Sequence, residues 1–311
     1  MGFDQDRTTA GSAPDLAWDE WVSLAHALLE RALRDAHVRG IFIKGPILTR
    51  QGLRRAHQSL DVDVLVDPGR RHVALETLAA HGWSVAVQVT SALTLPLHSV
   101  TLRHPRWPLE LDVHDRFPGF LADPRTVFEA LWQHRSTAVM AGRDVPCLTP
   151  VAHSVVAALH WLRDPDLVAH QAELDHLVAA LRPRLDIDSG ESLAALARET
   201  GSASTLAPFL RELGVQVDGP LYDDSLWRIR TASTGLKTVP WLVELRRTPV
   251  HMLPGRLAHA LVLTEAEIRQ AQPEAVPGAW GLFRARLRRI RWGLHDLPKA
   301  VRIVWRESRR R

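Results

Sequence analysis

The sequence predicts an α+β (mixed α/β) protein, in which a mixed sheet with flanking helices is followed by an all-helical domain. Before residue 150, short apolar or alternating runs typical of strands lie between segments with apolar residues at helical spacing. After residue 150, only helical spacing recurs. The 311 residues suffice for about two domains. Neither Gly-x-Gly-x-x-Gly nor Gly-x-x-x-x-Gly-Lys-Ser/Thr occurs, so the Rossmann and P-loop folds lack support.

The first half supplies the strands of the expected sheet. A helix over Asp19–Val38 precedes a buried strand at Ile41–Ile43, and Lys44-Gly45-Pro46 turns the chain into a short helix. Alternation of apolar and polar residues predicts strands over Leu60–Val66 and Leu109–His114. The remaining elements expected here are a helix over Val73–His81, strands over Trp83–Val89 and Leu93–Leu102, and a hairpin around Gly142.

Helices alone are expected in the second half. Thr149 is a typical N-cap for a helix that ends near Arg163. Later helices are expected over Asp166–Leu181, Ser192–Thr200, Ser204–Leu213 and Pro254–Ala271. We therefore divide the chain into a flexible leader (1–16), a mixed-sheet domain (17–150), a helical domain (151–272), and a linker with a basic amphipathic tail (273–311).

Composition excludes several classes of protein. Cys147 is the single cysteine, so an intramolecular disulfide, a four-cysteine zinc site and an iron–sulfur cluster are excluded, and we expect a cytoplasmic location. The sequence has no run of about 18 apolar residues, so a transmembrane helix is not predicted. The N-terminus also lacks the apolar core that is typical of a secretory signal. The net charge of +4 conceals an asymmetry, because residues 284–311 carry +9 and the remainder carries −5.

Two carboxylates two residues apart mark a candidate metal site. Asp61 and Asp63 share one face of their predicted strand, since side chains alternate along a strand. Such a pair repels unless a cation lies between the two groups, and Mg²⁺ prefers carboxylate oxygens. Asp112, on the polar side of another predicted strand, joins the site if the two strands are neighbours. The alternative is that Asp61 and Asp63 only keep an edge strand soluble.

A series of short motifs extends this pattern over residues 20–185. It comprises Ile41-Phe42-Ile43-Lys44-Gly45, Leu60-Asp61-Val62-Asp63-Val64-Leu65-Val66, Gly82-Trp83, Leu111-Asp112-Val113-His114, Leu159-His160-Trp161 and Leu174-Asp175. In this order the motifs resemble those of nucleotidyltransferases of the DNA polymerase β superfamily. More narrowly, they are similar to a bacterial family within that superfamily. The resemblance implies a nucleotidyltransferase-like sheet.

The resemblance also implies an activity and roles for particular residues. The activity would be transfer of a nucleoside monophosphate from an NTP such as ATP to a hydroxyl or phosphate of an acceptor, which is a small molecule, a peptide or a protein. Asp61, Asp63 and Asp112 would be the catalytic, metal-binding carboxylates for Mg²⁺, with Mn²⁺ as the alternative ion. Lys44 would neutralise phosphate charge, and Gly45 would let the backbone approach the nucleotide.

Three features depart from the family pattern, and one of them is that the strand carrying Asp61 is entered from Ser59-Leu60, where the family usually has a small residue. Pro46 stands where family members often have serine, which removes a hydroxyl and a backbone N–H. His57 stands where the family often has arginine, and Arg54 and Arg55 are nearby. These three residues of the 54–57 segment are therefore candidate substrate contacts. The departures bear on how phosphate is held rather than on metal binding.

Histidines near the motifs have both functional and structural interpretations. His114 shares its face with Asp112, so it is either a substrate contact or proton shuttle, or a histidine bonded to Asp112 or to a helix. For His160 we favour a structural pair with Asp175. A zinc site is disfavoured because His-x-x-Glu-His spacing is missing among the four histidines of this region, His153, His160, His170 and His176.

Two other functions stay open at this stage. One is a catalytically inactive nucleotidyltransferase fold that acts as a binding module, which Pro46 and His57 favour. The other is a nucleic-acid-binding protein that acts through the tail, whose segment Phe283–Trp292 is basic and amphipathic. The tail could equally bind an anionic membrane or an acidic partner, or pack its leucine and tryptophan side against the body.

Overall fold

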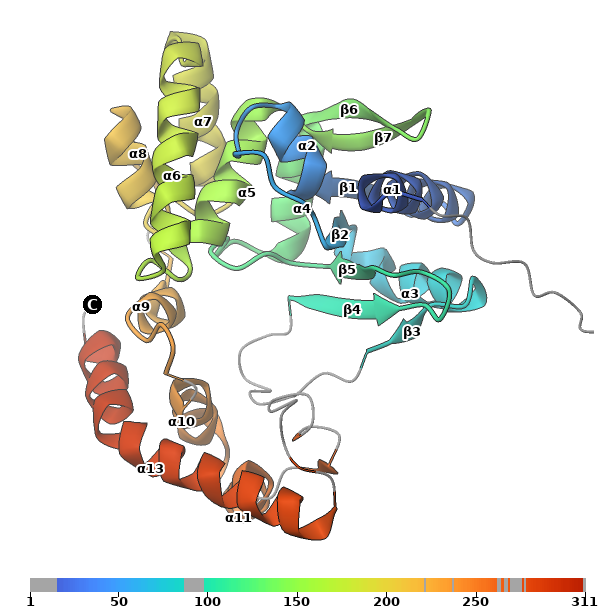
Figure 1. Cartoon of the computed structure of the whole chain (residues 1–311). Coiled ribbons are helices and arrows are strands. Elements are labelled where there is room, and N and C mark those ends of the chain that lie inside the picture. The colour runs from blue at the N-terminus through green and yellow to red at the C-terminus, as the bar shows by residue number, and fades with distance from the viewer. Residues whose placement is uncertain are drawn as a thin grey trace, which may run out of the picture.

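The computed structural model describes residues 16–86 and 98–309, apart from 221, 237, 262–263, 266–267, 269–275 and 277. Its sheet has seven strands in the order β3-β4-β5-β2-β1-β7-β6 (Figure 1). The strands are β1 (Gly40–Ile43), β2 (Asp61–Val66), β3 (Ser84–Val85), β4 (Ser99–Arg103), β5 (Glu110–His114), β6 (Arg135–Met140) and β7 (Arg143–Leu148). β2 runs parallel to β5 and antiparallel to β1, so the sheet is mixed, as predicted.

Helices lie on both faces of the sheet and continue beyond it (Figure 1). The first four are α1 (Trp18–Asp35), α2 (Gly45–Arg50), α3 (Arg71–Ala80) and α4 (Pro124–Gln133). The helices after the sheet are α5 (Pro150–Leu162), α6 (Val168–Leu181), α7 (Ile187–Glu199), α8 (Ala207–Leu213), α9 (Ser225–Thr231), α10 (Thr238–Arg247), α11 (Leu253–Leu261) and α13 (Ala279–Arg309). No helix in the described ranges is both long enough and apolar enough to cross a membrane.

The two faces of the sheet belong to two separate cores. Val62 and Val64 of β2 pack with α1 and α3, and Leu111 and Val113 of β5 join the same core. The opposite face packs against α4 and α5–α8 through residues such as Leu65. Strand alternation therefore turns Asp61, Asp63, Asp112 and His114 toward the side covered by the later helices.

Several elements differ from the sequence expectations. β3 is only two residues long and β4 begins at Ser99, while 87–97 lie outside the described residues, as do 1–15 of the predicted leader. α4, α9 and α10 were not expected. Thr149 is the N-cap residue of α5, as expected, but its side chain makes no capping hydrogen bond. The domain division at residue 150 stays a prediction.

The basic tail is a docked helix in this structure. α13 packs against α9 and α10, and Figure 1 shows it along the outer side of these helices, away from the sheet. Its buried positions include Gly281, Ala285, Ala300 and Val304. The alternative in which the leucine and tryptophan side of the tail packs on the body is not met by Leu287 and Trp292, which are 48% and 53% exposed. Small residues are buried instead, because they let two helix backbones approach closely. Most of the predicted linker, 273–275 and 277, lies outside the described residues.

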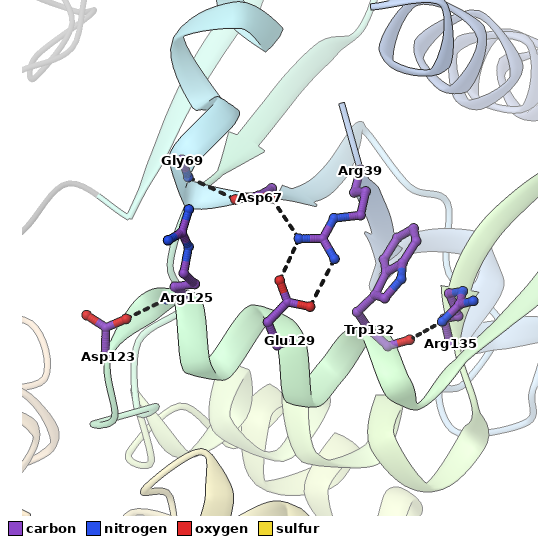
Figure 2. A network of polar contacts seen from close by, with 8 residues as sticks. All are labelled: Arg39, Asp67, Gly69, Asp123, Arg125, Glu129, Trp132 and Arg135. Atoms are coloured by element: carbon purple, nitrogen blue, oxygen red, sulfur yellow. Dashed lines mark hydrogen bonds and ion pairs between the residues drawn. The ribbon is translucent and has the colours of Figure 1, made fainter. Parts of the chain in front are cut away.

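Arg39 ties the end of β2 to α4 (Figure 2). Its guanidinium donates to both oxygens of Glu129, at 2.5 and 2.9 Å, and to Asp67 Oδ2 at 2.8 Å. The same group lies 5.0 Å from the Phe128 ring centroid and 5.4 Å from that of Trp132. The hydrogen bond from Arg39 holds the pKa of Glu129 below its usual range. This bidentate, ring-stacked arginine fixes the strand that carries Asp61 and Asp63.

We expect acid to destabilise the protein through His26 on α1. Burial lowers the pKa of His26 to about 4, and Nδ1 bonds the Val22 carbonyl at 2.8 Å. The unfolded chain binds this proton more readily, so the stability is fully present above pH 6.5 and is lost as the pH falls toward 4. At pH 5 the loss is about 2 kcal/mol. Thermal melts at pH 7 and pH 5 should show a smaller drop for His26→Gln than for the original chain. The exposed control His72→Gln should leave the drop unchanged, and equal drops for all three proteins would contradict the assignment.

Candidate functional site

Carboxylates from two neighbouring strands meet at the centre of the sheet. β2 and β5 pair in parallel with Asp63 opposite Asp112, and Asp61 lies opposite Glu110. The shared face follows from the alternation Asp-Val-Asp-Val in β2 and Leu-Asp-Val-His in β5, whose valines and leucine fill the core behind the sheet. The structure therefore brings Asp63 and Asp112 together across the strand pair, as required if both serve one site.

Asp63 is the most constrained of these groups. Its side chain is 3% exposed, and Oδ1 contacts Lys44 Nζ at 2.6 Å and His114 Nε2 at 2.8 Å. Burial raises the pKa of Asp63, but the charge of Lys44 and the hydrogen bond from His114 outweigh burial and hold the pKa below its usual range. Asp63 thus stays ionised despite its position. His114 bonds Asp63 rather than Asp112, which corrects the structural partner expected from the sequence.

Asp61 has too little positive charge around it. Burial and the neighbouring carboxylates Asp63 and Asp112 raise its pKa to about 6, and Lys44 only partly opposes them. Three carboxylates therefore share one nearby ammonium group. A divalent cation would relieve this repulsion, since a bound cation stabilises ionised oxygens.

Ligand atoms suited to a metal lie close together in the described part of the chain. One oxygen each from Asp63 and Asp112 and one ring nitrogen of His114 lie within 4.8 Å of one another. Asp61 is outside this group. Thr101 of β4 donates to Asp112 Oδ1 at 2.6 Å and so fixes the rotation of that carboxylate. The donor set fits a hard divalent ion, which takes carboxylate oxygens first.

A buried histidine holds the Lys44 turn in place. Lys44 adopts φ +60°, a conformation that costs energy for a residue with a side chain. Its backbone N–H donates to His153 Nε2 at 2.7 Å, and His153 Nδ1 donates to Gln51 Oε1 at 2.7 Å. The Gln51 amide in turn donates to the Leu148 carbonyl at 2.8 Å. The direction of this chain fixes the tautomer of His153, which burial keeps neutral by lowering its pKa to about 3.

The loop candidates lie apart from the hydrogen-bonded centre. Arg55 and His57 are exposed, and Arg54 is half-buried. The Arg55 N–H donates to Glu173 of α6 at 3.4 Å, and burial and the charge of Arg54 lower the pKa of His57. Gly45 has φ +54°, and a Cβ there would lie 3.4 Å from Ser59 Oγ, so its glycine suits the backbone conformation more than a crowded contact.

Other histidines gather near the carboxylates. The His98 ring stacks on His114 at 5.7 Å, and burial lowers the pKa of His98 to about 3. Burial, then the charges of Lys44 and Arg163, hold the pKa of His160 well below 6.5. Within the described residues, no hydrogen bond joins His160 to Asp175, and His160 Nδ1 is buried without a partner. The expected pair is therefore not formed, and the ring lies 5.6 Å from His170 instead.

Three residues that contact the site or its supporting turn were not predicted as site residues from the sequence: His98, Gln51 and His153. His98 lies within the strand predicted over Leu93–Leu102, where its type alone marks no site, and Gln51 follows a short helix. His153 lies in an apolar helix, where its type suggests packing. A histidine in an apolar helix can still be recognised as a residue with a polar contact, because a fully buried histidine needs partners for its ring nitrogens. The sequence does not identify that partner.

The fold and the paired carboxylates define a nucleotidyltransferase-type protein. A family model described as "Uncharacterised nucleotidyltransferase" matches residues 22–212, and the chain belongs to this family. α9–α13 lie beyond the matched region. No curated protein sequence matches the chain.

Several solved structures match part of the chain. An antigenic nucleotidyltransferase-like protein from Paracoccidioides brasiliensis is 14% identical, with 65% of this chain and 96% of that chain covered and a TM-score of 0.39. The lincosamide antibiotic adenylyltransferase LnuA, lincomycin-bound, is 16% identical over 51% and 96%, with a TM-score of 0.34. The antibiotic-resistance factor ANT(2'')-Ia is 15% identical over 62% and 94%, with a TM-score of 0.39. At these values we draw no conclusion about substrate from them.

Proposed function

We propose that the protein is a Mg²⁺-dependent nucleotidyltransferase that moves a nucleoside monophosphate from an NTP to a hydroxyl or phosphate of an acceptor. One observation carries this proposal. Asp61 and Asp63 of β2 lie on the same side of the sheet as Asp112 of β5, and burial, then the charges of Asp63 and Asp112, raises the pKa of Asp61 to about 6, which Lys44 only partly opposes. Such a shortage of positive charge at the centre of a sheet favours a cation site over a solubilising edge.

In the proposed reaction, Asp61, Asp63 and Asp112 would hold Mg²⁺, with Mn²⁺ as the alternative. The metal would supply charge for the triphosphate and polarise the phosphorus centre. Lys44 contributes a cation beside the same carboxylates, within 2.6 Å of Asp63. His114 and Thr101 orient Asp63 and Asp112 through single hydrogen bonds. Catalysis would consist mainly of positioning and charge neutralisation.

The nucleotide and the cell compartment are parts of the same proposal. We take ATP as the expected nucleotide and the cytoplasm as the location, where NTPs and Mg²⁺ are both abundant. Arg54, Arg55 and His57 are proposed contacts for the nucleotide or the acceptor because they follow α2 and precede β2. The acceptor would be a small molecule, a peptide or a protein.

Calorimetry with the full chain tests the nucleotide and metal together. Each of ATP, GTP, CTP and UTP is titrated with Mg²⁺ and again with EDTA. We expect saturable binding of at least one NTP in Mg²⁺ and its loss in EDTA. Equal binding in both conditions, or none in Mg²⁺, would contradict the proposal.

A binding module without turnover is the second candidate, and Pro46 is the observation that favours it. Proline occupies the first turn of α2 and supplies neither a hydroxyl nor an N–H there. Pyrophosphate release separates the two candidates. Metal-dependent NTP binding with no pyrophosphate, tested with a range of hydroxyl and phosphate acceptors, would favour the inactive module.

A further inference from the structure

α13 carries a strip of exposed apolar side chains along one side, and two of its members, Trp280 and Leu287, also line a pocket on this helix. The strip consists of Trp280, Phe283, Leu287, Leu294, Val301 and Trp305. Their spacings of three, four and seven residues place them along one side of a helix. All six are exposed, from 48% for Leu287 to 69% for Trp280. A strip of this length is unusual on a solvent-facing helix and marks an interaction surface.

Basic residues border the strip along one edge. Four exposed arginines lie on the adjacent side of the helix: Arg284, Arg291, Arg302 and Arg309. The first and third directly follow a strip residue, and the other two follow one by four positions. α13 as a whole carries nine Lys/Arg and two Asp/Glu, a net charge of +7. The opposite side of α13, with Ala285, Ala300 and Val304, is already packed on the protein. The outer side therefore combines exposed apolar and cationic groups.

We propose that the outer side of α13 binds the surface of an anionic phospholipid membrane, with the helix lying in the plane of the interface. Tryptophan, phenylalanine and leucine beside arginine suit the boundary between acyl chains and anionic headgroups. The inference concerns α13 alone and does not depend on the proposed reaction.

Charge and side-chain type disfavour the other occupants. A second copy would bring a second helix of net charge +7 against the first, and the two would repel. A nucleic acid would pair with the arginines but would leave Leu287, Leu294 and Val301 in water. Of these three occupants, the anionic membrane is the one that offers both negative charge and an apolar layer, and so covers both kinds of side chain.

Vesicle flotation with the full chain tests the proposal. Vesicles of phosphatidylcholine alone are compared with vesicles of phosphatidylcholine mixed equally with phosphatidylglycerol. We expect binding to the anionic vesicles, at least about tenfold weaker binding to the neutral ones, and a decline with added salt. Absence of binding to anionic vesicles by the full chain would overturn the proposal.

Paired substitutions show whether the strip and its border are responsible. Arg291→Gln with Arg302→Gln should weaken binding roughly 25-fold, from the usual attraction per arginine at an anionic surface. Leu287→Gln with Leu294→Gln should weaken it about tenfold or more. Val168→Gln with Ile187→Gln is the matched control, since these residues are 79% and 80% exposed on α6 and α7. Unchanged binding by either α13 pair, with melting curves like the original, would overturn the proposal.

The same variants show whether a nucleic acid or a second copy of the chain, rather than a membrane, binds the outer side of α13. Binding to a DNA duplex in place of vesicles, lost with the arginine pair, would assign the face to nucleic acid. A concentration-dependent dimer abolished by the leucine pair would assign it to a second copy. Either result contradicts membrane binding.

Discussion

Replacing Asp63 by Asn should lower turnover roughly a thousandfold while leaving the fold intact. Asp63 is the carboxylate on which Lys44 and His114 converge, at 2.6 and 2.8 Å. Removing its charge weakens the hold on the cation and leaves Lys44 beside a neutral amide. Loss of several kcal/mol of electrostatic stabilisation corresponds to this fall in rate. Initial rates of pyrophosphate release and Mn²⁺ binding by calorimetry measure both consequences.

His160→Ala is the comparison that gives the Asp63 result its meaning. His160 lies beside the same charges but is neutral and makes no hydrogen bond through its buried Nδ1 in the described part of the chain. We expect its removal to cost about tenfold or less in turnover. A larger loss for His160→Ala than for Asp63→Asn, with matching melting curves, would mean that the reaction depends on the histidine rather than on the carboxylates.

The carboxylate face could be predicted from the sequence because strand alternation is local. Once Val62 and Val64 are assigned to the core, Asp61 and Asp63 must point the other way. The pairing of Asp63 with Asp112 could not be derived in the same way, because the 48 residues between them can return to the sheet in several registers. The resemblance to a family predicted that Asp63 and Asp112 share one site. In the structure, the parallel pairing of β2 with β5 brings the two residues together.

The hydrogen-bond partners of buried polar groups could not be predicted from the sequence, for a different reason. His153 bonds a backbone N–H 109 residues away, and nothing in its own helix specifies that contact. Likewise, α13 has a side of small residues and a side of large apolar ones, and the sequence pattern favours docking the larger. Packing against α10 selects the smaller side, so Trp280 and Leu294 stay exposed. Both outcomes depend on tertiary contacts.

His153→Leu should reduce turnover about a hundredfold through the position of Lys44. The leucine fills a similar volume but accepts no hydrogen bond, so the buried Lys44 N–H loses its partner and the turn with φ +60° loses its support. The unfolding free energy should fall by about 2 kcal/mol. Displacement of the Lys44 ammonium from Asp63 would misplace a charge that the reaction needs, which explains the larger effect on rate. Denaturant titration and steady-state kinetics measure the two effects separately.

A double-mutant cycle distinguishes positioning from general damage to the fold. If His153 acts through Lys44, then His153→Leu combined with Lys44→Gln should be hardly slower than Lys44→Gln alone, because the amine that His153 positions is already absent. Multiplicative losses would mean that His153 affects turnover by another route. His176→Leu is the matched control, since this half-buried histidine lies on a different helix, α6, and its buried Nε2 has no hydrogen-bond partner in the described part of the chain. Its turnover should stay within about threefold of the original, because no hydrogen bond to the Lys44 turn depends on it.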